Sequence, residues 1–181
     1  MTKHLSFIFG LCAIIFFAAC DKEETNDDQW KNANEAQFAK MSTNAEYKRI
    51  NSATTAGYIM YKELKSGNGA TPYFTDRVKV LYTGWYKRDW TQPKDTYTDS
   101  QGNTIINKII FDSTNRNIPS EFAVKGLIDG FTTALQHMQV GDKWEVWIPW
   151  KLAYGASGYS SGNIPGYTML VFEIELVSIV E

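Results

Sequence analysis

Alternation of hydrophobic and polar residues dominates the chain from residue 58 onward and predicts β-strands. The clearest run is residues 169–180, where alternate apolar residues would face a core and Glu173 and Glu175 would face solvent. Shorter runs of the same kind predict four more strands, over residues 58–64, 77–85, 109–113 and 144–148. Turns that contain glycine, serine or proline separate these runs, which indicates a mostly antiparallel sheet.

Two segments have the 3.6-residue apolar spacing of a helix instead. The clearer one predicts a short helix over residues 127–138, with one apolar face made of Leu127, Ile128, Phe131, Leu135 and Met138. Residues 30–50 carry a thinner apolar stripe without glycine or proline and predict a helical extension over residues 30–55. Such a helix gains most of its stability from packing. The sequence leaves open whether it packs on its own domain or on a second copy, which would give a homodimer.

The segment over residues 87–108 interrupts the strand pattern. It is polar, contains Pro93 and Gly102, and is rich in aspartate, threonine and asparagine. This composition predicts an extended hairpin or a surface insertion. Together with the strands and the short helix, it indicates an α+β domain over residues 56–181.

The first nineteen residues, 1–19, have the pattern of a secretory signal peptide. Lys3 and His4 precede an apolar run over residues 5–17, which is short for a membrane span. Small residues directly before Cys20 resemble a bacterial lipoprotein cleavage box. In such a box the cysteine is lipidated, and it would anchor the protein to the outer membrane of the cell envelope. The alternative is an ordinary secretory signal that happens to contain cysteines.

The residues after Cys20 are acidic and carry no apolar side chain, so residues 20–29 are expected to form a solvated tether. The acidic run resembles the surface-export signals of some bacterial lipoproteins, and a plain spacer is the equal alternative. The sequence therefore leaves open whether the domain lies on the periplasmic or the surface-exposed face of the membrane.

Composition and charge exclude several functions for this chain of 181 residues. A formal net charge of −2 argues against a nucleic-acid-binding surface. After cleavage the chain would keep one histidine, His137, and one cysteine, Cys20, which are too few for a structural zinc site. It has no Gly-x-Ser-x-Gly motif and no Gly-Lys-Ser/Thr phosphate-binding loop. We therefore expect neither a serine-hydrolase site nor a bound metal, nucleotide or other cofactor.

Six short motifs, in order along the chain, resemble those of FKBP-type peptidyl-prolyl cis-trans isomerases. They are Val-Leu-Tyr-Thr-Gly at 80–84, Phe-Asp-Ser at 111–113, Leu-Ile-Asp-Gly-Phe at 127–131, Leu-Ala-Tyr-Gly at 152–155, Ile-Pro at 164–165 and Leu-Val-Phe at 170–172. The resemblance covers roughly residues 57–181. It implies an antiparallel half-barrel sheet of five to six strands wrapped around one short helix, with the proline ring of a substrate bound between them.

The resemblance also implies roles for individual residues. Tyr82, Asp112 and Tyr154 would be catalytic. Asp112 would pair with Tyr82 and face the carbonyl of the X–Pro bond, while the Tyr154 hydroxyl would donate to a substrate carbonyl. The substrate-binding residues would be Phe111, Leu127, Ile128, Phe131, Tyr159, Ile164 and Phe172, with the Ile128 backbone amide as a second donor.

Three positions depart from the family pattern. Phe131 stands where the family usually has tryptophan, Ser120 where a phenylalanine commonly completes the pocket rim, and Asn163 where an apolar residue precedes Ile164. Without the order of the motifs, the aromatic and branched residues would be interpreted as plain core and Asp112 as a turn-capping residue. Their ordered combination favours the pocket.

The expected function is isomerisation of X–Pro bonds in proteins that fold outside the cytoplasm, with proline-containing polypeptides as partners and macrolides as candidate inhibitors. Uncatalysed isomerisation takes tens to hundreds of seconds, slow enough to limit folding. A dry, apolar hollow would disfavour the charge-separated planar amide relative to the twisted one. One alternative is a weakly or non-catalytic proline-peptide-binding or chaperone lipoprotein, which Phe131 and Ser120 favour. Another is a surface lipoprotein whose 87–108 insertion binds a glycan or a partner protein.

Overall fold

The computed structural model describes residues 25–54, 56–114 and 118–180. Within them, seven strands form one sheet in the order β1-β2-β8-β9-β3-β6, with β7 paired to β3. These strands are β1 (Lys48–Asn51), β2 (Tyr58–Lys65), β3 (Arg77–Lys87), β6 (Lys108–Ser113), β7 (Ser120–Ala123), β8 (Lys143–Ile148) and β9 (Leu170–Val180). A separate hairpin joins β4 (Thr96–Thr98) to β5 (Thr104–Ile106). The helices are α1 (Asn26–Ser42) and α2 (Asp129–Leu135), with short 3₁₀ turns η1 (Val124–Gly126), η2 (Trp150–Leu152) and η3 (Ser160–Gly162).

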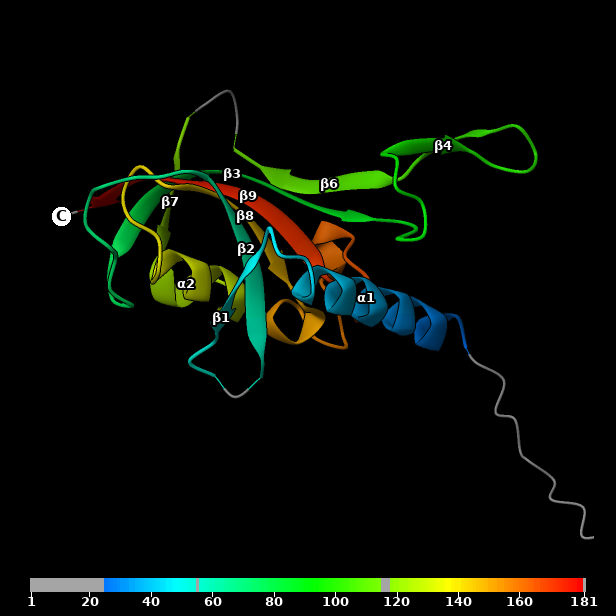
Figure 1. Cartoon of the computed structure of the whole chain (residues 1–181), viewed down its shortest axis with the longest axis horizontal. Helices are drawn as coiled ribbons and strands as arrows, with labels where there is room; N and C mark the ends of the chain where they lie inside the picture. Colours follow the sequence, from blue (N-terminus) through cyan, green and yellow to red (C-terminus); the bar gives the residue numbers. More distant parts are fainter. Residues whose placement is uncertain (1–24, 55, 115–117, 181) are drawn as a thin grey trace, which may run out of the picture.

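The sheet curves over α2, as Figure 1 shows. β9 lies between β8 and β3, pairs antiparallel with both, and buries alternate residues as its sequence predicts. All residues of α2 after Asp129 are buried. A Cβ atom at Gly130 would overlap the Ile148 side chain of β8, so glycine allows helix and strand to lie this close. The predicted half-barrel around one short helix is confirmed, with β1 and β7 raising the strand number to seven.

α2 is shorter than the helix predicted over residues 127–138. Leu127 and Ile128 have extended backbone, with ψ of 168° and 147°, and the helix ends at Leu135. The apolar residues on both sides of the helix still pack against the core, so the apolar spacing continues beyond the helical backbone. The consequence for function is that the Ile128 amide lies just outside the helix.

The N-terminal helix was predicted with the wrong ends. α1 begins at Asn26 rather than at residue 30, because Thr25 and Asp28 form a reciprocal capping box that starts the helix. Residues 26–29, part of the predicted solvated tether over residues 20–29, are exposed and belong to the helix. The helix ends at Ser42 rather than at residue 50, because Lys48–Asn51 pairs residue for residue with β2 as strand β1. The chain division expected at residues 55–56 stays a prediction.

α1 packs on its own domain. Asn34, Phe38 and Met41 are its buried residues. The Asn34 Oδ1 accepts from the Trp90 Nε1–H at 3.0 Å and from the Met169 backbone N–H at 2.9 Å. The apolar side of α1 is therefore covered by its own domain. A homodimer through α1 would have to use the exposed, polar side of the helix.

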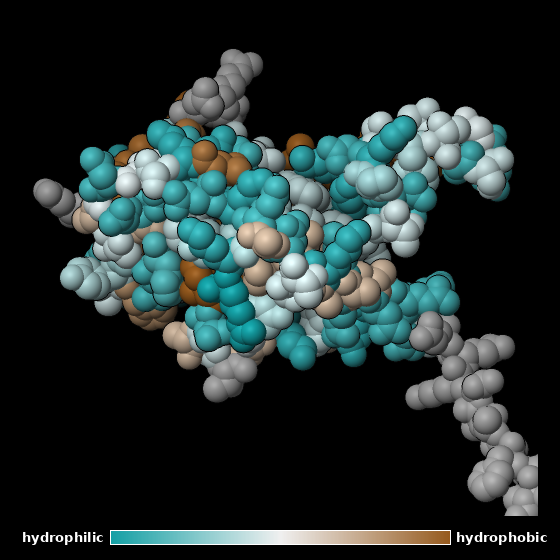
Figure 2. All heavy atoms as spheres, viewed as in Figure 1, coloured by the Kyte–Doolittle hydropathy of each residue, from teal (hydrophilic) through white to brown (hydrophobic). Residues whose placement is uncertain are grey.

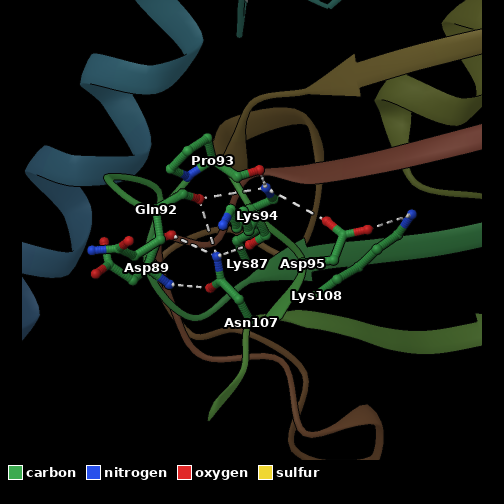
Figure 3. Close-up of polar contacts among 8 residues, drawn as sticks. All are labelled: Lys87, Asp89, Gln92, Pro93, Lys94, Asp95, Asn107 and Lys108. Atoms are coloured by element: carbon green, nitrogen blue, oxygen red, sulfur yellow. Dashed lines mark hydrogen bonds and ion pairs between the residues drawn. The ribbon is translucent and has the colours of Figure 1, made fainter. Parts of the chain in front are cut away.

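The 87–108 insertion forms the hairpin that its sequence predicts, and it projects from the body of the molecule (Figure 1). Asn107 closes the base of the hairpin (Figure 3). Its Nδ2 donates to the carbonyls of Asp89, Gln92 and Lys94 at 3.1, 3.1 and 2.9 Å, and its Oδ1 accepts from the Asp89 N–H at 2.9 Å. The hydrophobic spots on the face in Figure 2 are isolated, and the hairpin there is mainly polar. Glycan or partner binding by this insertion stays a prediction.

No helix in residues 25–54, 56–114 and 118–180 combines the length and the hydropathy needed to cross a bilayer. The predicted signal peptide over residues 1–19 and the predicted lipidation site at Cys20 lie outside the described residues.

Candidate active site

A hollow of about 310 Å³ opens between the sheet and the N-terminal end of α2. Strands β3, β6, β7 and β9, the turn before α2 and the long loop before β9 all contribute to it. Its lining residues are Tyr82, Phe111, Asp112, Phe122, Gly126, Leu127, Ile128, Phe131, Tyr154, Tyr159 and Phe172. Apart from one carboxylate and three phenol hydroxyls, these side chains are apolar, so the hollow suits a small, uncharged ring.

Perpendicular aromatic rings build the floor and one wall. The Phe131 ring is 5.1 Å from that of Phe172 and 6.1 Å from that of Tyr82, at interplanar angles of 85° and 90°. Phe111 meets Phe172 at 5.5 Å and 87°. Edge-to-face pairs of this kind are a favoured aromatic geometry. A Cβ atom at Gly84 would lie 2.6 Å from both the Phe111 and the Phe172 ring, so the glycine of the 80–84 motif leaves room for this wall.

A bulge brings two consecutive residues of β6 to the same hollow. Gly84 pairs with Asp112, but the next residue, Trp85, pairs with Ile110, and Phe111 is left without a partner in β3. In a regular strand, Phe111 and Asp112 would point to opposite faces. The bulge redirects one of them, so both line the hollow.

The carboxylate is held by a tyrosine. The Tyr82 hydroxyl donates to Asp112 Oδ2 at 2.6 Å. Burial, and after it the hydrogen bond to Asp112, raise the pKa of Tyr82. The phenol therefore stays protonated near neutral pH and keeps donating, which fixes the Asp112 carboxylate at the rim of the hollow.

Two other donors at the hollow are unused. Among the described residues, neither the Tyr154 hydroxyl nor the Ile128 backbone N–H has a hydrogen-bond partner. Burial, then the neighbouring Tyr159 and Asp112, raise the pKa of Tyr154, so its hydroxyl also stays protonated. The Tyr154 ring stacks on Tyr159 at 4.9 Å and 13°, which limits where the hydroxyl can point. The site therefore offers two fixed donors to the carbonyls of a ligand.

The structure brings together nine of the ten predicted site residues: Tyr82, Phe111, Asp112, Leu127, Ile128, Phe131, Tyr154, Tyr159 and Phe172. The tenth, Ile164, is buried and does not line the hollow, and its backbone exchanges two hydrogen bonds with Tyr159, at 2.8 and 3.0 Å. A direct contact of Ile164 with substrate stays a prediction.

Phe122 and Gly126 also line the hollow, and neither is among the predicted site residues. The Phe122 ring lies 5.8 Å from the Tyr82 ring. It therefore supplies a phenylalanine at the rim, where Ser120 was expected to leave none. Ser120 and Phe122 are two residues apart in β7, so they lie on the same face of that strand. This period-two relation was the signal that could have found Phe122.

Comparisons with known proteins agree with the geometry of the hollow. Residues 69–177 match the family model described as FKBP-type peptidyl-prolyl cis-trans isomerase. The chain is 38% identical to the FKBP-type 22 kDa peptidyl-prolyl cis-trans isomerase of Escherichia coli K12, over 77% of this chain and 57% of that protein. It is 36% identical to the outer membrane protein MIP of Legionella longbeachae, over 67% of this chain and 44% of that protein. It thus spans about half the length of these curated relatives.

A solved structure agrees as well. A peptidyl-prolyl cis-trans isomerase from Pseudomonas syringae pv. tomato superimposes with a TM-score of 0.65 at 30% identity, covering 87% of this chain and 98% of that one. FkpA from Escherichia coli superimposes with a TM-score of 0.60 at 26% identity, covering 83% of this chain and 59% of that one. With the ordered motifs, the half-barrel and the hollow in agreement, the chain belongs to the family of FKBP-type peptidyl-prolyl cis-trans isomerases.

Proposed function

We propose that the protein is a peptidyl-prolyl cis-trans isomerase that assists the folding of proteins outside the cytoplasm. The observation that carries the proposal is the pair of unused donors, the Tyr154 hydroxyl and the Ile128 amide, at an otherwise apolar hollow. Family membership and the names of the relatives support the same activity.

The proposed reaction needs no nucleophile. A client proline ring enters the hollow above Phe131, and carbonyls on either side of it accept from Tyr154 and Ile128. Rotation about a peptide bond costs about 18–20 kcal/mol, because amide resonance is lost. The planar amide is charge-separated and well solvated by water, so a dry hollow removes more stabilisation from it than from the twisted amide. Donors that fit the twisted geometry better add differential binding. A macrolide that fills the same hollow would inhibit the reaction.

Asp112 contributes through its charge in this scheme. The oxygen of a planar X–Pro amide carries more negative charge than that of the twisted amide. A carboxylate that faces this oxygen therefore raises the energy of the planar form more than that of the twisted form. Tyr82 keeps the carboxylate in place through the 2.6 Å hydrogen bond.

The first test is a protease-coupled isomerisation assay with a short X–Pro peptide. The wild-type protein should raise the rate above background, and Tyr154→Phe should lower kcat/KM by about three- to tenfold, the worth of one neutral hydrogen bond. Tyr73→Phe is the matched control, because Tyr73 is 76% exposed and does not line the hollow. Its rate should equal that of the wild type.

A folded protein with no rate above background would reject the isomerase proposal. Retention of peptide binding by that protein would then identify it as a proline-peptide-binding or chaperone protein without turnover. Equal rates for Tyr154→Phe and the wild type would remove Tyr154 from the mechanism while leaving the activity in place.

We further propose that the protein is a lipoprotein of the cell envelope, anchored to the outer membrane through Cys20. The name of the relative from Legionella longbeachae, an outer membrane protein, supports an envelope location. Because α1 begins at Asn26, only residues 21–25 would separate the lipidated cysteine from the helix. Five extended residues span at most about 18 Å, so the start of α1 would stay within about that distance of the lipid anchor.

Replacement of the proposed anchor tests this location. Cys20→Ser should move the protein from the membrane fraction to the soluble fraction and abolish the incorporation of labelled fatty acid. Cys12→Ser, within the predicted signal peptide, is the matched control and should leave the protein in the membrane fraction. A Cys20→Ser protein that stays lipidated would contradict the proposal.

A further inference from the structure

Trp30 of α1 is hydrogen-bonded to the loop that presents the two tyrosines of the hollow. We define this active-site loop as residues 154–168, from Tyr154 to Thr168. The Trp30 Nε1–H is shared between the Gly166 carbonyl and the Thr168 Oγ1, at 3.1 Å each. Thr168 is only 2% exposed, and its hydroxyl donates onward to the Pro165 carbonyl at 2.7 Å. The helix thus holds the returning limb of the loop.

The two limbs of the active-site loop are joined to each other. The Tyr167 N–H donates to the Gly155 carbonyl at 2.9 Å, directly after Tyr154. A Cβ atom at Gly166 would overlap the Ala156 carbonyl oxygen, so these backbones touch. A displacement of the returning limb would therefore shift the limb that carries the Tyr154 hydroxyl.

Tyr86 of β3 makes a second connection between α1 and the loop. Its hydroxyl donates to the Asn163 carbonyl at 2.9 Å. Asn163 has a left-handed backbone with φ of 52°, a conformation that asparagine tolerates better than most residues. The Tyr86 ring lies between the Trp30 ring, at 6.4 Å and 77°, and the Phe111 ring of the hollow, at 6.4 Å and 29°. Burial raises the pKa of Tyr86, so its hydroxyl remains a donor near neutral pH.

α1 is also hydrogen-bonded to the residues that precede and follow the loop. Before the loop, the Trp150 Nε1–H donates to Glu35 of the helix at 3.0 Å. After the loop, the Met169 N–H donates to Asn34 of the helix at 2.9 Å. Figure 1 shows α1 beside the segment coloured orange, which contains the loop. The helix therefore holds both ends of the loop and one point within it.

We propose that α1 positions the active-site loop, with Trp30 and Tyr86 as positioning residues that act through Tyr154. The inference rests on the isomerase function proposed above. A free loop would sample many positions of the Tyr154 hydroxyl, and only some of them would meet a substrate carbonyl. The hydrogen bonds from the helix and from Tyr86 reduce this sampling before the substrate arrives, which lowers the entropic cost of reaching the transition state.

The test compares two variants that each delete one partly buried phenol hydroxyl. Tyr86→Phe removes the hydrogen bond to the loop. Tyr47→Phe removes a hydrogen bond of 2.5 Å to Glu145, and neither Tyr47 nor Glu145 lines the hollow. Tyr86→Phe should lower kcat/KM for a short X–Pro peptide by about three- to tenfold. Tyr47→Phe should leave kcat/KM unchanged. Trp30→Phe, which keeps a ring but loses the N–H, should resemble Tyr86→Phe.

Two further readouts separate positioning from general stability. If Tyr86 acts through Tyr154, the variant with both replacements should be no slower than Tyr154→Phe alone, because the effects are not additive. Hydrogen exchange at the Asn163 and Ile164 amides should be faster in Tyr86→Phe than in Tyr47→Phe. The inference would be overturned if the rate losses of Tyr86→Phe and Tyr154→Phe multiply in the double variant, or if Tyr86→Phe and Tyr47→Phe show equal exchange. If the wild type proves inactive, the proposed function fails. The exchange comparison, with Trp30→Phe in place of Tyr86→Phe, then decides whether the helix holds the loop.

Discussion

Replacing Asp112 by alanine is expected to lower kcat/KM for a short X–Pro peptide by about ten- to a hundredfold. Two unit charges about 4 Å apart interact by about 4 kcal/mol near a protein surface. The amide oxygen loses only part of a charge on twisting, so about 1.4–2.8 kcal/mol is at stake, and each ~1.4 kcal/mol corresponds to a tenfold change in rate. The replacement removes the carboxylate that, in the proposed mechanism, faces the X–Pro carbonyl. It also frees the Tyr82 hydroxyl, which donates to this carboxylate at 2.6 Å. Because Asp112 and its bond to Tyr82 are exposed at the rim, water can replace the lost bond, and the free energy of unfolding should fall by no more than about 1.5 kcal/mol.

Two other variants give this expectation its controls. Asp112→Asn keeps an acceptor for Tyr82 but loses the charge, and its rate should lie between those of the wild type and Asp112→Ala. The difference in rate between the wild type and Asp112→Asn then measures the effect of the charge. Asp99→Ala removes a partly exposed carboxylate from the turn between β4 and β5, does not touch the hollow, and should leave kcat/KM unchanged. If Asp112→Ala stays within twofold of the wild type, the electrostatic part of the proposed mechanism is wrong.

Three of the five strands that the sequence predicts, β3, β8 and β9, bury one face. In β3, β8 and β9 alternate residues are buried, so a period of two is visible in the sequence itself. β1 and β7 have four residues each and only weak alternation of burial. They exist because their backbones pair with the edges of β2 and β3, and backbone pairing leaves no trace in side-chain order.

The predicted site residues are those that lie in short local motifs. What the sequence hides are features that depend on long-range geometry. The bulge that turns Phe111 and Asp112 to one hollow depends on how β6 pairs with β3. The contact between Asn34 and Met169 joins residues 135 positions apart, and no local pattern predicts it. The helical extension therefore looked like an appendage in the sequence, whereas the structure packs it against the active-site loop.

The 87–108 insertion depends on one buried amide in the same way. Asn107 has no exposed surface, and its side chain makes four hydrogen bonds to the backbone of residues 89–94 (Figure 3). The segment that it closes carries Trp90, whose Nε1–H donates to Asn34 of α1. Asn107 therefore holds both the base of the hairpin and one of the contacts that fix the helix.

Asn107→Asp is expected to lower the free energy of unfolding at pH 8 by about 3 kcal/mol, because it places a carboxylate against three carbonyl oxygens. Burial and these oxygens disfavour the charged form, so the pKa of the introduced carboxyl is raised in the folded protein. The folded state then binds more protons than the unfolded state once the pH exceeds about 4, the ordinary value. Stability relative to the wild type should thus fall as the pH rises from there and recover on acidification. Urea denaturation at pH 5 and pH 8 measures this difference.

Two replacements separate charge from the loss of hydrogen bonds. Asn107→Ala deletes all four bonds and adds no titratable group, so its destabilisation should be the same at pH 5 and pH 8. Asn68→Asp introduces the same charge at an exposed asparagine and should change stability by less than about 0.5 kcal/mol. An Asn107→Asp protein as stable as the wild type at pH 8 would mean that the insertion closes without this amide. Trp90 joins the insertion to α1, and α1 is hydrogen-bonded to the active-site loop. In Asn107→Asp, hydrogen exchange in the active-site loop should therefore also be faster at pH 8 than in the wild type.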